Sequence, residues 1–216
     1  MAEQLALELG TLVAPPETVV SRCNEDAYAL VAQWPRWPHP IVLVTGEAGS
    51  GKSHLAGRFA AEAGVETVPG AALTGELAVT LAADTVVVDD ADKADDTALF
   101  HLINAVRNAG STMLLTATTR RRGGLADLDS RLRAVPEVAL GAPDDALLRR
   151  VMFDAFARRQ LAVDAAVVDF LIARMERTLH EAVEWPARLD HEGLARQRGP
   201  TRPLASRLIE AKTGST

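Results

Sequence analysis

The chain has 216 residues, of which 48% are hydrophobic and 24% charged, enough for one α/β domain with a modest appendage. Its formal net charge of −6 lacks the basic signature of a DNA-binding domain, so we expect a nucleotide and other proteins as partners, with no direct sequence-specific DNA binding. The single cysteine, Cys23, excludes an intrachain disulfide and a cysteine-based zinc site.

The first 20 residues are predicted to form an extended arm, because Pro15 and Pro16 prevent a helix there. The arm has no basic segment ahead of an apolar one, which argues against a secretory signal. No apolar run approaches the roughly 20 residues of a transmembrane helix. We therefore expect a cytoplasmic protein with no membrane partner. Beyond the arm, a helix capped by Ser21 is predicted over 21–33, followed by a proline-rich connection.

Short apolar strands then alternate with helices. The predicted strands are 41–45, 65–68, 85–89, 111–117 and 135–140. The predicted helices between them are 53–63, 73–82, 95–108 and 125–133. Repeated β-α units of this kind predict a parallel, doubly wound sheet of five strands.

No strand is predicted after residue 143. The remaining helices are expected to begin at the caps Asp144 and Asp164, near Thr178, and at Pro203. This pattern divides the chain into an N-terminal arm (1–20), an α/β nucleotide-binding domain (21–143) and a small all-helical lid domain (144–212).

A phosphate-binding motif stands between the first strand and its helix. Residues 46–53 read GEAGSGKS and fit G-x-x-x-x-G-K-[ST]. Backbone N–H groups of such a loop surround the phosphates of ATP or ADP, while Lys52 would neutralise the β- and γ-phosphates and Ser53 would bind Mg²⁺. The predicted nucleotide-binding residues here are Gly46, Glu47, Ala48, Gly49, Ser50, Gly51, Lys52, Ser53 and His54.

Polar residues follow two later strands. The strand 85–89 ends in Asp89, which is expected to help hold Mg²⁺, and Asp90 is a candidate to orient or deprotonate an attacking water. The alternative for this pair taken alone is a strand that ends in an acidic turn. Thr118, after the fourth strand, is a candidate sensor of the γ-phosphate, although threonine is also an ordinary strand residue.

Residues 127–132 read DLDSRL and place Arg131 on the helix before the fifth strand. An arginine offered to the triphosphate of a neighbouring molecule can be worth about 10³–10⁵ in rate. In isolation, an ordinary surface arginine is the alternative interpretation.

The order GEAGSGKS, VVVDD, LLTATT and DLDSRL, followed by helices, resembles the AAA+ domain of the DnaA family of replication initiators, and within it the short Hda-like inactivators of DnaA. Because the predicted helical segment runs to the end of the given sequence, we expect no helix-turn-helix domain. The segment QLALEL at residues 4–9 is similar to the sliding-clamp-binding peptide of the Hda-like proteins. In that peptide, the matching residues are Gln4, Leu5, Leu7 and Leu9.

The resemblance implies a regulator of chromosome replication initiation that binds the sliding clamp, the beta subunit of DNA polymerase III. It would stimulate hydrolysis of ATP bound to DnaA, with Arg131 as an arginine finger acting in trans. The family's phosphate-contacting lid arginine falls in the segment that contains Arg177 and His180. The register places His180 at that position and Arg177 one turn earlier, so we expect weak intrinsic ATPase activity. Homo-oligomer formation is left open.

Three alternatives remain from the sequence alone: a helicase-loader ATPase, a DnaA-like ATPase and a small-molecule P-loop kinase. A kinase needs an acceptor pocket, of which the sequence gives no sign. A helicase loader needs contacts with single-stranded DNA, which the net charge of −6 does not support.

Overall fold

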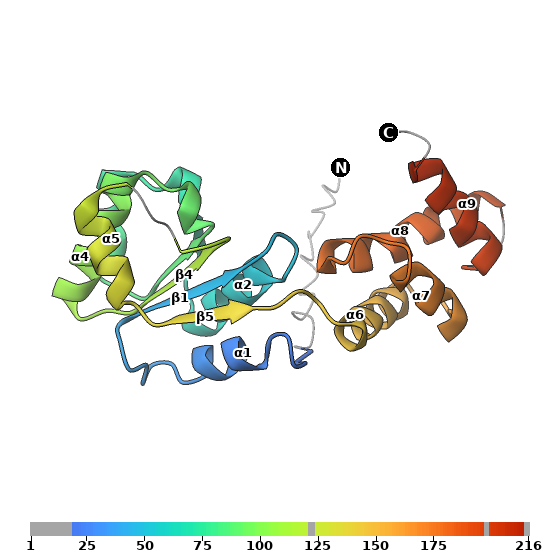
Figure 1. Cartoon of the computed structure of the whole chain (residues 1–216), viewed down its shortest axis with the longest axis horizontal. Helices are drawn as coiled ribbons and strands as arrows, with labels where there is room; N and C mark the ends of the chain where they lie inside the picture. The colour runs from blue at the N-terminus through green and yellow to red at the C-terminus, as the bar shows by residue number, and fades with distance from the viewer. Residues whose placement is uncertain (1–18, 121–123, 197–198, 214–216) are drawn as a thin grey trace, which may run out of the picture.

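The computed structural model describes residues 19–120, 124–196 and 199–213. Figure 1 shows a sheet with helices on both of its faces, joined by one connection to a separate group of helices. The candidate clamp-binding peptide, residues 4–9, lies outside the described residues. Within them, no helix combines the length and the apolar character needed to cross a membrane.

The sheet has five strands in the order β2-β3-β4-β1-β5. All four neighbouring pairs are parallel, which confirms the predicted five-stranded parallel sheet. The strands are β1 (Ile41–Gly46), β2 (Thr67–Pro69), β3 (Val86–Asp89), β4 (Met113–Ala117) and β5 (Glu137–Leu140). Because β1 lies between β4 and β5, the loop that follows it emerges at the sheet's carboxyl edge, beside the ends of both neighbouring strands.

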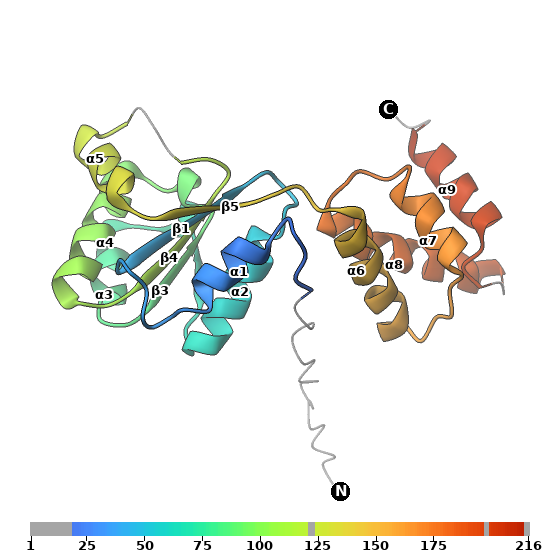
Figure 2. The ribbon, with the colours of Figure 1, turned by 60° about the horizontal axis from the view of Figure 1, so that its bottom comes forward.

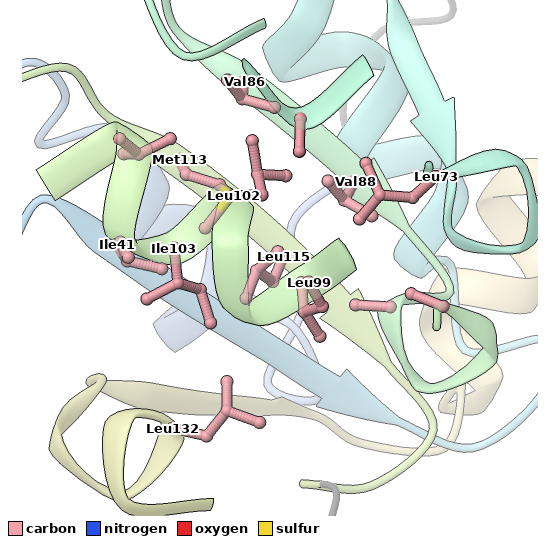
Figure 3. Packing of buried hydrophobic residues seen from close by; sticks show 14 of the residues in the cluster. Ile41, Leu73, Val86, Val88, Leu99, Leu102, Ile103, Met113, Leu115 and Leu132 are labelled. Carbon is pink, nitrogen blue, oxygen red and sulfur yellow. The ribbon is translucent and has the colours of Figure 1, made fainter. Parts of the chain in front are cut away.

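Helices cover both faces of the sheet (Figure 2). One face carries α1 (Glu25–Val31) and α2 (Lys52–Ala63), and the other carries α3 (Gly75–Leu81), α4 (Asp96–Ala109) and α5 (Ala126–Ala134). Alternation along the strands divides the core: in β1, Ile41 and Leu43 belong to the α3–α5 side, and Val42 and Val44 to the α1–α2 side. Figure 3 shows the α3–α5 side, where Leu99, Leu102 and Ile103 of α4 lie over the strands.

The helical part consists of α6 (Asp145–Arg158), α7 (Ala165–Ile172), α8 (Leu179–Arg196) and α9 (Arg202–Thr213). The carboxylates of Asp144 and Asp164 cap α6 and α7, accepting hydrogen bonds from the N–H groups of Leu147 and Ala166 at 2.8 Å. These helices enclose a hydrophobic cluster of their own, centred on Met152, Phe156, Leu171, Trp185 and Leu189. The chain therefore has separate hydrophobic cores in its sheet part and in its helical part.

The first helix departs from the prediction. It begins at Glu25 rather than near Ser21, with Asn24 at the N-cap position. The side chain of Asn24 bonds to the preceding loop and does not cap the helix. Its Oδ1 accepts a hydrogen bond from the Ser21 N–H at 2.7 Å, and its Nδ2 donates one to the Val19 carbonyl at 3.0 Å. Val19 and Asn24 of this segment line the cavity described below.

Candidate nucleotide-binding site

The loop between β1 and α2 has the geometry of a phosphate-binding loop. Gly49 and Gly51 have φ values of +77° and +103°, which side-chain-bearing residues rarely adopt. Lys52 opens α2 and is only 6% exposed. Its ammonium group donates to the carbonyl oxygens of Gly46 at 2.7 Å and Glu47 at 2.9 Å. The loop thus surrounds its own cation, beside the free N–H groups of a helix N-terminus.

Ser50, in the same loop, carries a buried polar atom with no partner. Its side chain is 4% exposed, and its Oγ makes no hydrogen bond to any other described residue. Buried hydroxyl groups are normally hydrogen-bonded, so an orphaned one indicates a missing ligand. A phosphate oxygen is a suitable partner for it, which is independent support for a nucleotide in this loop.

Asp89, at the end of β3, is joined to the neighbouring strand by a buried hydroxyl. Thr116 of β4 is fully buried; its Oγ1 donates to Oδ1 of Asp89 and accepts from the N–H of Asp90 at 3.0 Å. Thr116 lies in a polar run noted in the sequence, but sequence reasoning selected Thr118 from that run. The structure assigns to Thr116 the task of orienting the carboxylate of Asp89.

Thr118 lies farther along, outside this hydrogen-bonded group. Its N–H donates to Oδ2 of Asp92 at 3.2 Å, and its carbonyl accepts from the N–H of Gly46 at 3.3 Å. Thr118 and Glu47 line a separate open hollow of about 890 Å³ at the carboxyl edge of the sheet. Thr118 is therefore next to the first residue of the phosphate-binding loop, but its side chain faces a different hollow from that of Lys52.

Asp90 has a strained backbone conformation, and its carboxylate forms an ion pair. Its φ of +54° is unusual for a residue other than glycine. Its Oδ2 accepts from the ammonium of Lys93 at 2.7 Å, and this hydrogen bond raises the pKa of the exposed Lys93. This ion pair engages one of the two carboxylate oxygens of Asp90.

The oxygen donors near the loop fit Mg²⁺. Ser53 supplies a hydroxyl in the first turn of α2, and Asp89 supplies carboxylate oxygens from the adjacent strand; α2 and β3 are in contact. Mg²⁺ prefers such hard oxygen ligands and keeps several waters. Among the described residues, no three His, Cys, Asp or Glu side chains gather into a metal site. Mg²⁺ would therefore depend on nucleotide phosphates and water for most of its ligands.

A cavity of about 640 Å³ opens from the loop toward the helical part, within the size range of ligand pockets. Lys52, Ser53 and His54 line it from the sheet part, and Leu179 and His180 line it from α8. Further lining residues are Val19, Tyr28, Leu147, Val151 and Arg158. Sequence reasoning missed this second group, because α1 and α6 reach the cavity only through tertiary packing.

The start of α8 touches the phosphate-binding loop directly. The N–H of Leu179 donates to the carbonyl of Gly49 at 3.1 Å. A methyl group on Gly49 would lie 2.5 Å from Cβ of Thr178, and one on Gly51 would lie 2.8 Å from Cδ1 of Leu179. The glycines of the loop therefore serve the packing of the helical part as well as the backbone conformation.

The two candidate lid residues differ in position. His180 lines the cavity. Arg177 does not: its Nη1 pairs with Oδ1 of Asp145 at 2.7 Å, and its Nη2 donates to the Pro143 carbonyl at 3.0 Å. Arg177 thus holds the connection between the two parts of the chain.

The cavity is electropositive near His54. Burial lowers the pKa of the His54 imidazole, and the charges of Arg58 and Arg158 lower it further. All three effects disfavour the imidazolium, so the free site holds a neutral histidine beside several cations.

Arg131 lies on α5, away from the cavity. Its guanidinium stands 5.7 Å from the centroid of the Phe100 ring of α4. Since α5 covers the face opposite α2, Arg131 is separated by the sheet from the helix that follows its own phosphate-binding loop (Figure 2).

No protein-family model matches the chain. An uncharacterized protein of Haemophilus influenzae is 25% identical over 190 residues, which cover 79% of this chain and 81% of that protein. Among solved structures, domain III of the Thermotoga maritima replication initiation protein DnaA is similar, with a TM-score of 0.75 and 16% identity over 90% of this chain and 94% of that one. The T. maritima Holliday junction branch migration motor RuvB is also similar, with a TM-score of 0.67 and 18% identity over 86% and 66% of the two chains.

DnaA bound to AMPPCP and single-stranded DNA is a third similar structure, with a TM-score of 0.66 and 16% identity; this chain spans 66% of its length. Identities at this level establish a shared fold and leave activity to be argued from the site. The five-stranded parallel sheet, the loop at 46–53 and the helices that follow it are the parts of this fold that surround the cavity. The chain has the AAA+ P-loop fold.

Proposed function

We propose that this protein binds ADP or ATP with Mg²⁺ in the cavity beside Lys52, and that it regulates replication initiation by acting on DnaA. In this proposal, the segment at 4–9 tethers the protein to the sliding clamp. Arg131 then enters the nucleotide site of DnaA and stimulates hydrolysis of the ATP bound there. The protein's own nucleotide is retained and hydrolysed slowly.

The observation that carries nucleotide binding is the gathering of phosphate-binding groups in the loop at residues 46–53, which opens onto the cavity. Ser50 of this loop has a buried hydroxyl without a partner among the described residues, Lys52 is held by carbonyl oxygens of its own loop, and Lys52 and Ser53 at the start of α2 line the cavity. A di- or triphosphate satisfies all of these groups at once. The apolar lining from Val19, Leu147 and Val151 then suits a nucleobase.

Slow intrinsic hydrolysis is supported by the state of the polar groups. The ion pair with Lys93 occupies one carboxylate oxygen of Asp90, and Arg177 is held by Asp145 outside the cavity. His180 lines the cavity, but an imidazole offers fewer N–H donors to developing negative charge than a guanidinium does. We expect turnover well below about 1 s⁻¹, the low end of ordinary enzymes.

A role toward DnaA is supported by the likeness to DnaA domain III and by the position of Arg131. Arg131 lies on α5, which the sheet separates from α2, so we assign its charge to the site of a partner rather than to its own cavity. The guanidinium rests on Phe100, which limits its freedom without neutralising it.

The test is a hydrolysis assay that contains ATP-loaded DnaA, DNA carrying the clamp, and purified variants of this protein. We expect Arg131→Ala to bind nucleotide like the parent and to fail to stimulate hydrolysis, with a loss of about 10³-fold or more. Arg133→Ala, on the same helix, is the matched control and should stimulate normally. Stimulation by Arg131→Ala at the parental rate would contradict the finger role.

Two further variants separate the parts of the proposal. Lys52→Ala should lose nucleotide binding, because the phosphates lose the ammonium group of the loop. Deletion of residues 1–10 should abolish clamp binding and leave nucleotide binding intact. A parent protein that binds nucleotide but neither DnaA nor the clamp would favour a helicase-loader ATPase or a P-loop kinase.

A further inference from the structure

An arginine at the end of α6 in the helical part lines the cavity. Arg158 ends α6 and lines the same cavity as Lys52 and Ser53, from the opposite side. Its side chain is exposed, and it makes no hydrogen bond or ion pair with another described residue. Cations without a partner beside a cavity are available to an anionic ligand.

The neighbouring charges do not satisfy Arg158. The carboxylate that lines the cavity, Asp154, is engaged by Arg150 at 3.0 Å on the same helix. Arg159 lines the cavity too, and its Nη1 makes a long hydrogen bond of 3.5 Å to the carbonyl of Ala155. Arg177 is held by Asp145 outside the cavity. Of these arginines, Arg158 is the one left free toward the cavity.

The location of Arg158 along the phosphates follows from His54. In phosphate-binding loops, backbone N–H groups at the helix start cradle the α- and β-phosphates, while the lysine reaches the β- and γ-phosphates. His54 follows Ser53 in the first turn of α2, so we place the α-phosphate on its side of Lys52. His54 of α2 and Arg158 of α6 line the same cavity.

We propose that Arg158 binds the nucleotide at its α-phosphate side and so links α6 to the ligand in place of Arg177. This inference rests on the proposed nucleotide binding at residues 46–53 and is independent of DnaA and the clamp. The planar guanidinium of Arg158 can donate two parallel N–H groups to phosphate oxygens. Because ADP and ATP share an α-phosphate, Arg158 contributes equally to both affinities and does not distinguish them.

Isothermal calorimetry on the full chain, stripped of nucleotide and titrated with Mg·ADP and Mg·ATP, tests the proposal. Arg158→Met, which keeps the apolar stem but removes the charge, should weaken both ligands by about tenfold, the value of one charge-assisted hydrogen bond. Arg158→Lys, which keeps the charge but lacks the paired N–H groups, should recover part of the loss. Arg177→Ala, and Arg207→Ala on the exposed surface of α9, should bind like the parent.

The outcomes are distinct. Any of three results overturns the role of Arg158. These are parental nucleotide affinity in Arg158→Met, weaker nucleotide binding in Arg177→Ala, and a loss of affinity for ATP alone. A loss in Arg158→Met that Arg158→Lys does not recover indicates a packing role and also overturns it. If Lys52→Ala binds nucleotide as well as the parent does, the proposed function fails, whatever the Arg158 variants show.

Discussion

At the scale of single residues, the candidate site depends on polar atoms that lack partners or are shared. Thr116 uses one hydroxyl both to donate to Asp89 and to accept from the N–H of Asp90. Replacing it by valine would leave that N–H unsatisfied at a buried position and free the carboxylate to rotate. Asp89 is therefore oriented from β4 before any metal ion arrives.

His54 gives a residue-scale prediction of pH dependence. Burial, Arg58 and Arg158 lower its pKa in the free protein, so its neutral form contributes stability above the ordinary value of about 6.5, and this contribution is lost as the pH falls through the lowered pKa. Bound phosphates add negative charge beside the imidazole and should raise this pKa. NMR titration of the histidine signals with and without ADP measures the shift.

The His54 signal can be assigned with a His54→Gln variant. His101, which lies on α4 against Phe100, is the internal control, and its signal should not change when ADP is added. A His54 pKa that is unchanged or lower with ADP bound would mean that the phosphates lie elsewhere.

At the scale of elements, α8 is anchored by a buried carboxylate in its first turn. Glu181 is 5% exposed and accepts from Nη1 and Nη2 of Arg188 at 3.1 and 3.2 Å; Nζ of Lys212 in α9 lies 2.8 Å away. Burial opposes ionisation of Glu181, but these two cations outweigh it and hold its pKa below the usual value. The carboxylate therefore ties α8 to α9.

We expect Glu181→Gln to lower the free energy of unfolding by about 1–2 kcal/mol at pH 7. This is less than for a fully buried ion pair, because Arg188 and Lys212 are partly exposed and solvent screens their charges. The stabilisation is present above the unfolded pKa of about 4.3 and is lost as the pH falls through the lower folded pKa. Urea denaturation at pH 7 and below pH 4 measures both effects. Glu184→Gln on the same helix is the control, and equal losses in the two variants would refute the anchor.

The elements show what local sequence can predict. Strand and helix bounds agree to within a few residues, because apolar β-branched runs and acidic caps such as Asp95 and Asp144 act locally. The start of α1 was missed because Asn24 bonds backward to the loop. The roles of Thr116, Tyr28 and Arg158 required the pairing of β3 with β4 and the docking of α6, which no local pattern encodes.

At the scale of the whole molecule, two hydrophobic cores are joined by a short connection and by the contact of Leu179 with Gly49. Few buried apolar contacts cross this boundary. We expect differential scanning calorimetry of the free protein to show two transitions, one for each core. ADP should bring the two transition temperatures closer together or merge them, because in the proposed site it would contact groups from both parts. As a control, Lys52→Ala should still show two transitions when ADP is present. A single transition in the free parent protein would refute separate unfolding of the two parts.

The hydrogen bond between Leu179 and Gly49 attaches the first residue of α8 to the phosphate-binding loop, so a small rotation there moves the whole helix. The helix has 18 residues, and at about 1.5 Å per residue it is about 27 Å long. A rotation of about 10° at the phosphate-binding loop would displace its far end by about 5 Å, by simple geometry on that length. A rearrangement of the peptide group at Gly49 would thereby be amplified at the far end of α8, the helix that α9 contacts.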